Sequence, residues 1–302
     1  MKSSSTYLAT ALGLFTLSLA TPTSLPPKLP TRSSPGAGQL RLLHTSTPST
    51  PSSRIASSRI GFTSTSTSRE EESTKGGALL SLSPSSQNNN TLTSVTATFQ
   101  IPQAKMPTRG PTANQTLGLY AASFHIGIDS VSGTCSSFLR AGVDIFRDGS
   151  LDEDLQDPQA WYQFGPNDPV GFGNFSVAEG ELVRVTVGVT EVKIENFGAN
   201  VTCARGLAPK QVASAKIDAK GSLCAREVAW TVEDFPLAGL PGIPVALADF
   251  GAVRFRDVGV LGSETKNATG AVVSDVRLAA QGGRLTSCLV TGEGGEVRCD
   301  RV

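Results

Sequence analysis

The chain has 302 residues, which is enough for one large β domain or two smaller domains. Its 26 basic and 26 acidic residues balance to a net charge of zero. Residues 1–72 hold seven of the basic and three of the acidic residues. The rest of the chain therefore has 19 basic and 23 acidic residues, which give it a net charge of −4. This mildly acidic remainder argues against nucleic acid as a partner.

The N-terminus has the pattern of a secretory signal peptide over residues 1–20. Lys2 supplies the positive end, Tyr7–Ala20 is apolar or small, and Ser18-Leu19-Ala20 fits a cleavage site. The run is too short to cross a bilayer, and no later stretch is long enough. We therefore expect a secreted, extracellular protein with no membrane association after signal removal.

Residues 21–72 are rich in Ser, Thr and Pro and have no regular apolar period. Such a segment cannot bury enough surface to offset the entropy of ordering it. We expect a disordered propeptide or linker here, or a glycosylated stalk.

The cysteines and histidines limit the cofactor chemistry. Five cysteines make disulfides plausible in an exported protein, and their odd number leaves at least one without an intrachain partner. No Cys-x-x-Cys pair occurs, and His125 is the one histidine after residue 72, so we expect no metal and no cofactor. Glycosylation tripeptides, which indicate a glycoprotein, begin at Asn89, Asn114, Asn174, Asn200 and Asn267.

From about residue 73 the sequence alternates between apolar and polar residues and is interrupted by turn formers. The clearest strand patterns are Val95–Ile101, Leu182–Val189, Val192–Asn196, Glu227–Phe235, Val245–Phe250 and Ala252–Asp257. No amphipathic helix of three turns is evident, which favours an all-β sandwich or barrel of antiparallel strands. Trp161 and Trp230 lie within such runs, where each could pack in the core or line a substrate groove.

Two segments far apart in the chain carry a family resemblance. Residues 138–144 read Phe-Leu-Arg-Ala-Gly-Val-Asp, and residues 223–235 read Leu-Cys-Ala-Arg-Glu-Val-Ala-Trp-Thr-Val-Glu-Asp-Phe. Both resemble signature segments of the eqolisins, the fungal glutamic peptidases. In that family the first segment has a glutamine where this chain has Arg140, and the second has a glutamate where it has Ala229.

Other segments follow in the same order, so that the resemblance covers residues 73–257. They are Lys75–Leu79, Ser94–Pro102, Tyr120–Asp129, Gln159–Pro166 and Ala248–Val253. The resemblance places His125 where a groove tryptophan is expected and Gln163 where a groove glutamate is expected. Residues 258–302 lie mostly beyond it and are interpreted as a C-terminal extension.

The resemblance implies a concanavalin A-like β-sandwich of two antiparallel sheets, with an active groove on one concave face. It also implies a precursor with a propeptide, a polypeptide substrate or peptide ligand, and acid hydrolysis of peptide bonds. We expect the protein to be a monomer. The groove residues would be His125, Trp161, Gln163 and Trp230. Arg140 and Ala229 would occupy the positions of the catalytic dyad.

The family's reaction needs a carboxylate that takes a proton from water and an amide that donates to the oxyanion. Arg140 can donate to an oxyanion, but it would lower the pKa of a nearby carboxylate and weaken it as a base. Ala229 has no group that can transfer a proton. Losing a general acid or base costs on the order of 10²–10⁴ in rate, so we predict a catalytically impaired member.

Two alternatives remain open. Glu227 shares the strand face of Ala229 and could serve as a substitute carboxylate, although it lies about 7 Å along the strand. We expect it instead to form a cross-strand ion pair with Arg140. The other alternative is a carbohydrate- or peptide-binding sandwich module with no catalytic function.

Overall fold

A computed structural model gives the structure of the protein. It describes residues 72–82, 92–108, 118–149, 156–217, 223–235, 245–262 and 265–302. The expected signal peptide, nearly all of the expected propeptide, and the glycosylation tripeptides at Asn89 and Asn114 lie outside these ranges. None of the described segments forms a helix long and apolar enough to cross a membrane.

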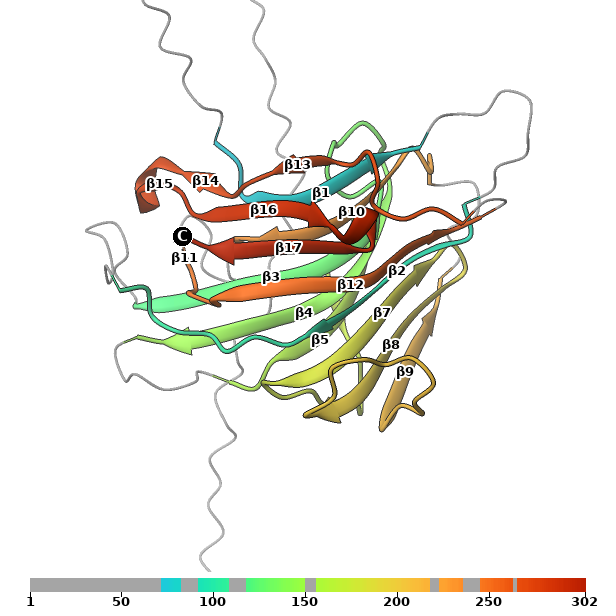
Figure 1. Cartoon of the computed structure of the whole chain (residues 1–302), viewed down its shortest axis with the longest axis horizontal. Coiled ribbons are helices and arrows are strands. Elements are labelled where there is room, and N and C mark those ends of the chain that lie inside the picture. The colour runs from blue at the N-terminus through green and yellow to red at the C-terminus, as the bar shows by residue number, and fades with distance from the viewer. Residues whose placement is uncertain are drawn as a thin grey trace, which may run out of the picture. The chain divides into compact units, whose positions relative to one another are not determined.

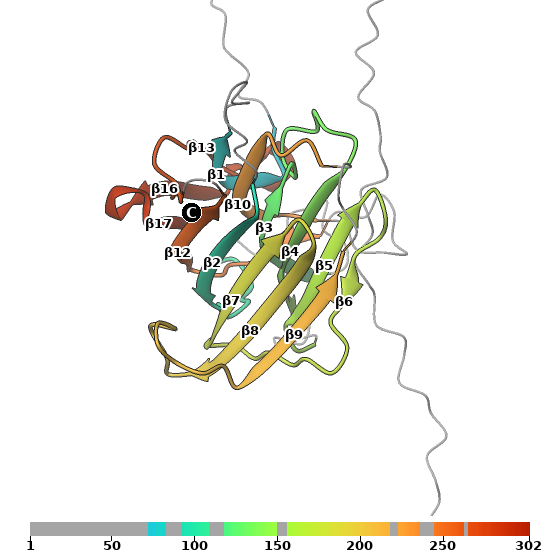
Figure 2. The ribbon, with the colours of Figure 1, turned by 90° about the vertical axis from the view of Figure 1, so that its right-hand side faces the viewer.

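Most described residues belong to two large β-sheets that face each other (Figures 1 and 2). Along one sheet, called here the site sheet, the strand order is β13 (Val272–Ser274), β1 (Lys75–Ser81), β10 (Glu227–Glu233), β3 (Leu119–Ile128), β4 (Phe138–Asp148), β5 (Gln159–Gly165) and β6 (Val170–Gly171). Its neighbours pair antiparallel, and the short β11 (Ala246–Leu247) adds a parallel pairing to β3. The prediction of an all-β sandwich is confirmed.

The second sheet has seven strands, again antiparallel. Their order is β16 (Thr286–Thr291), β17 (Glu296–Arg301), β12 (Ala252–Leu261), β2 (Ser94–Gln100), β7 (Glu181–Gly188), β8 (Glu191–Ala199) and β9 (Gln211–Lys216). A small separate pair, β14 (Arg277–Leu278) with β15 (Gly283–Arg284), flanks the 3₁₀ turn η1 (Ala279–Gln281), and a second turn, η2 (Gly292–Gly294), precedes β17.

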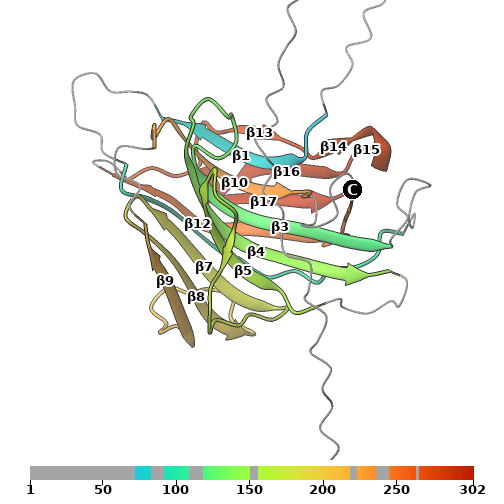
Figure 3. The same ribbon diagram turned by 180° about the vertical axis from the view of Figure 1, so that it is seen from behind.

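The core lies between the two sheets and is built from the inward side chains of both. Phe99 of β2 packs edge-on against Phe255 of β12, and Phe124 of β3 packs edge-on against Phe250. Because successive side chains of a strand alternate between its faces, one half of each site-sheet strand contributes to this core. The other half points to the outer face of the site sheet, which is turned toward the viewer in Figure 3.

The central strands of the site sheet are buried along nearly their whole length on both faces. Every residue of β10 is buried, and only Leu119 of β3 is partly exposed. The outward residues of these strands include charged and polar side chains, which can be buried only if they have hydrogen-bond or charge partners. The outer face of the site sheet is therefore where the polar chemistry of this fold is concentrated.

Residues 258–302, set apart above as an extension, contribute strands to both sheets. β12 runs through this boundary, β13 pairs with β1, and β17 pairs with β12. The Cys288–Cys299 disulfide joins β16 to β17, and Val276, Leu285 and Val297 lie in the core.

A second disulfide, Cys135–Cys224, ties the loop after β3 to the residues that precede β10. The sequence left the pairing open and required one leftover cysteine, which is the exposed Cys203. Asp129 strengthens the same junction, because its carboxylate accepts the backbone N–H groups of Ala225 and Arg226 at 2.7 and 2.8 Å. These links fix β10 against β3.

Asp234, directly after β10, gives the fold a dependence on pH. Its carboxyl accepts a hydrogen bond from Gln281 Nε2 at 2.7 Å, and burial raises its pKa to about 7, with the charge of Glu233 adding to the increase. A raised folded-state pKa means that the neutral carboxyl is favoured by folding, so this stabilisation is complete below pH 4 and is lost as the pH rises through about 7.

We therefore expect wild-type protein to lose up to about 4 kcal/mol of unfolding free energy between pH 4 and 7.5 relative to Asp234→Asn. Urea titrations across this pH range measure the difference. Asp168→Asn, which alters an exposed aspartate, is the matched control and should keep the wild-type profile. Parallel profiles for wild-type and Asp234→Asn would refute the assignment.

Candidate active site

The two positions predicted for the catalytic dyad lie in one cross-strand row on the outer face of the site sheet. Ala229 of β10 pairs with Gly127 of β3, and Gly127 pairs with Arg140 of β4. Gln163 of β5 continues the row beyond Arg140. The two positions are thus on strands that flank β3 rather than on strands that pair directly, and Gly127 lies between them.

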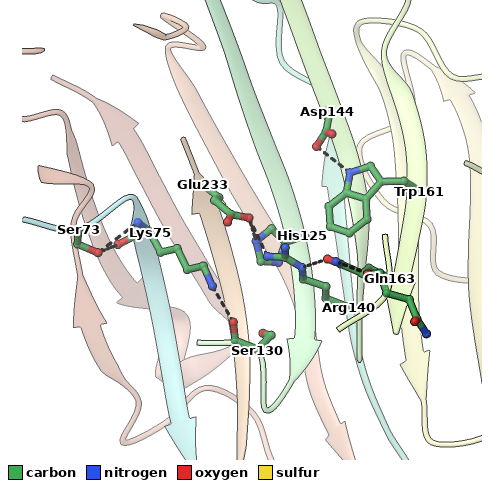
Figure 4. Close-up of polar contacts among 10 residues, drawn as sticks. Ser73, Lys75, His125, Ser130, Arg140, Asp144, Trp161, Gln163 and Glu233 are labelled. Atoms are coloured by element: carbon green, nitrogen blue, oxygen red, sulfur yellow. Dashed lines mark hydrogen bonds and ion pairs between the residues drawn. The ribbon is translucent and has the colours of Figure 1, made fainter. Parts of the chain in front are cut away.

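Arg140 is buried and held by two side chains from different strands (Figure 4). Its Nε donates to Gln163 Oε1 at 2.7 Å, and its Nη1 donates to Glu233 Oε2 at 2.9 Å. The guanidinium also lies over the rings of Phe138 and Trp161, with 5.2 and 5.5 Å from Cζ to the ring centroids. A fully buried guanidinium requires such compensation, because unpaired burial of a charge is very costly.

The expected ion pair between Arg140 and Glu227 is wrong. The carboxylate that binds Arg140 is Glu233, four residues along β10 from Ala229 in the opposite direction from Glu227. Glu227 Oε1 instead accepts the backbone N–H groups of Val131 and Ser132 at 2.9 and 2.8 Å. Two backbone amides thus bind this carboxylate by charge-assisted hydrogen bonds.

Glu233 connects Arg140 to His125. The same Oε2 that binds Arg140 lies 3.0 Å from His125 Nε2, and both Glu233 and the imidazole are buried. One carboxylate oxygen therefore lies between a permanent cation and a titratable base. Figure 4 shows this Arg140–Glu233–His125 cluster, which includes one of the two predicted dyad positions.

The remaining predicted groove residues divide between the two faces. Trp161 lies on the outer face, where its Nε1 donates to Asp144 Oδ1 at 2.7 Å and its ring centroid is 5.8 Å from that of His125. Trp230 packs in the core between the sheets and donates to Thr96 O at 3.2 Å, so its assignment to the groove is wrong. The cause is strand alternation, since a residue next to Ala229 must face the other way.

Sequence reasoning overlooked two residues beside the dyad row. Lys75 of β1 donates from Nζ to the carbonyl oxygen of Ser130 at 2.8 Å (Figure 4). The Ser130 side chain lies next to Gly127. No motif marks either residue, because their positions depend on the turn after β3 and on the pairing of β1 with β10.

The glycosylation tripeptides remain predictions. Asn174 and Asn200 are exposed. Asn267 is half-buried, and its Nδ2 donates to the Glu293 carbonyl oxygen at 2.9 Å. A glycan is therefore easier to attach to the first two.

Solved β-sandwich structures of a glutamic peptidase share this fold. A solved structure of scytalido-glutamic peptidase with a peptide-based transition state analog superposes with a TM-score of 0.55 at 25% identity, covering 76% of this chain and 99% of that one. A second structure of that peptidase with a transition state analog inhibitor has a TM-score of 0.56 at 24% identity and covers the same shares of the two chains.

Sequence comparison agrees with the fold. Residues 73–301 match the Peptidase A4 family, and the chain belongs to that family. Aspergillopepsin-2 of Aspergillus niger is 31% identical over 177 residues, which are 58% of this chain. The chain spans 57% of the length of that relative. Scytalidopepsin B of Scytalidium lignicola is 26% identical over 227 residues, or 73% of this chain and 75% of that protein.

The buried ion pair makes a testable prediction about stability. Glu233→Gln removes the carboxylate beside a buried guanidinium, so we expect the unfolding free energy to fall on the order of 3–5 kcal/mol. Arg140→Met combined with Glu233→Gln should cost less than the sum of the single changes, because the two residues act as a pair. Chemical denaturation at neutral pH measures all three.

The control is Asp257→Asn, which breaks the exposed Arg205–Asp257 pair at 3.5 Å and should change stability by less than about 1 kcal/mol. If Glu233→Gln lowers the unfolding free energy no more than this control does, the ion pair does not hold Arg140 in place.

Proposed function

We propose that this chain is an exported member of the glutamic peptidase family whose peptidase activity is impaired or absent, and which retains a groove for peptides on the outer face of the site sheet. The observation that carries the proposal is the row Ala229–Gly127–Arg140, where one end presents a methyl group and the other an engaged guanidinium. The dyad positions themselves rest on the sequence resemblance.

Hydrolysis at this row requires a base within hydrogen-bond reach of the attacking water. The methyl group of Ala229 cannot accept a proton. Glu233 is bound to Arg140 and His125, and Asp144 accepts a hydrogen bond from Trp161. These carboxylates are therefore placed as structural acceptors and not as bases next to the row.

Glu227 is the strongest alternative base, since it lies on the same face of β10 as Ala229. It is two residues, or about 7 Å, from that position. Its Oε1 accepts two loop amides, which hold the carboxylate against the turn after β3. Productive sites hold the base within well under 1 Å of its required position relative to the attacking water. The displacement of Glu227 from the row is far larger than that.

Binding of a peptide is supported by the comparison rather than by exposed side chains, because Trp161 and Gln163 on the outer face are 4% and 1% exposed in this structure. The comparison structure of scytalido-glutamic peptidase holds a peptide-based transition state analog. Export is supported by the N-terminal signal pattern and by two disulfides, which persist in oxidising compartments.

The first prediction concerns the unmodified protein. Incubated with denatured casein in strongly acidic buffer, it should release no more fragments than a heat-inactivated sample does. Pepstatin is included to silence contaminating aspartic peptidases. Clean pepstatin-resistant cleavage that disappears in Glu227→Gln would refute the proposal and identify Glu227 as the substitute base. Binding on a glycan array without peptide binding would favour the carbohydrate-binding alternative.

The second prediction concerns a variant that carries the family's glutamine and glutamate at the two dyad positions. Arg140→Gln combined with Ala229→Glu should create acid cleavage of casein above the wild-type level, because it supplies both an amide donor and a carboxyl. The matched control combines Arg140→Gln with Ala229→Gln, which keeps the size of the side chain but removes the titrating group. Equal activity of the two variants, with circular dichroism showing intact folds, would count against the assigned positions.

A further inference from the structure

Ser130 places a hydroxyl group over the centre of the predicted dyad row. A Cβ built on Gly127 would lie 2.5 Å from Ser130 Oγ, 2.8 Å from Ser130 Cβ and 3.0 Å from Arg140 Cβ. Gly127 pairs with Ala229 on one side and with Arg140 on the other. The hydroxyl therefore lies above the residue that separates the two positions.

The turn after β3 holds Ser130 there from several directions. Asp129 adopts a left-handed conformation with a φ of 54°, which turns the chain back toward the sheet, and its N–H donates to the Glu227 carbonyl oxygen at 3.0 Å. The Ser130 carbonyl oxygen accepts Lys75 Nζ at 2.8 Å. Figure 4 shows Ser130 between the Lys75 and Arg140 side chains.

The Ser130 hydroxyl forms no hydrogen bond within the described part of the fold. Ser130 is 7% exposed, and its Oγ is buried without a hydrogen-bond partner among the described residues. A buried hydroxyl without a partner is destabilising, and native structures seldom contain one. The Asp129 and Lys75 contacts explain the position of the backbone at Ser130, but no contact explains the direction of its side chain.

We propose that Ser130 occupies the place that an attacking water would need between positions 140 and 229, so that it is a third obstacle to hydrolysis besides the two dyad positions. This inference rests on the proposed function. Directly opposed side chains on neighbouring strands lie about 4.5–5.5 Å apart at Cβ. A water that touches both a carboxyl on β10 and an amide on β4 must then lie above β3 at Gly127, where Ser130 Oγ lies.

The test compares activities in the background of Arg140→Gln with Ala229→Glu. Adding Ser130→Gly should raise acid cleavage of casein at least tenfold over this background. Ser130→Ala, which removes Oγ but keeps Cβ, should give a smaller gain. Ser214→Gly, at an exposed serine of β9 in the other sheet, is the matched control and should leave the activity of the background unchanged.

The outcomes separate the inference from the proposal beneath it. Activity that Ser130→Gly leaves unchanged would overturn the inference while the proposed function stands. Activity that Ser130→Gly removes would also overturn it, because the hydroxyl would then assist the reaction. No activity in any folded variant carrying Ala229→Glu, with or without Ser130, would overturn the assigned dyad positions and with them the inference, whereas the proposed function fails if the unmodified protein itself cleaves casein.

A measurement without activity checks the geometry. Gly127→Ala should lower Tm by about 2–4 °C or more in the wild-type background, because the added methyl meets Ser130 Oγ and Cβ. In a Ser130→Gly background the same change should lower Tm by less than half as much, since the two shortest of these contacts are then gone. Equal shifts in the two backgrounds would show that Ser130 does not cover Gly127.

Discussion

The register of β10 and β4 on the two sides of β3 determines what the outer face of the site sheet can do. Pairing through Gly127 puts Ala229 and Arg140 into one row, and the same register sends Trp230 into the core. A slip by one residue would exchange the faces of every side chain on these strands. The Cys135–Cys224 disulfide and the Asp129 contacts with the backbone before β10 oppose such a slip.

Given this register, the charge at Arg140 dictates much of its surroundings. A guanidinium that is 1% exposed must be neutralised and hydrogen-bonded within the fold. Gln163 and Glu233 meet this need from β5 and β10, and His125 shares the Glu233 oxygen. Glu233 is therefore committed to an ion pair, so that the arginine at the dyad position also fixes a carboxylate beside the row.

Much of the fold could be predicted from the sequence, because alternation along strands and the order of short segments are local properties. The alternation also implied that Trp230 and Ala229 face opposite ways, so the misplacement of Trp230 was avoidable. The partner of Arg140 was not predictable in this way. Both Glu227 and Glu233 share the face of Ala229, and the choice between them depends on loop amides at Val131 and Ser132 that no pattern reveals.

The roles of Ser130 and of residues 258–302 were hidden for a related reason. Ser130 reaches the row through a left-handed turn at Asp129, and β13, β16 and β17 join sheets whose other strands are distant in sequence. Pairings of that kind are properties of the assembled fold. Local residue patterns carry little information about them.

Enzymes bind a transition state analogue more tightly than a matching substrate, by roughly 10²–10⁸-fold, because catalysis is preferential binding of the transition state. The most direct measurement is calorimetric titration of the unmodified protein, in acidic buffer, with a peptide and with its transition state analogue of the same sequence. If Ala229 leaves the row without a proton acceptor, the two dissociation constants should agree within about tenfold. An analogue bound a hundredfold or more tightly would contradict the account.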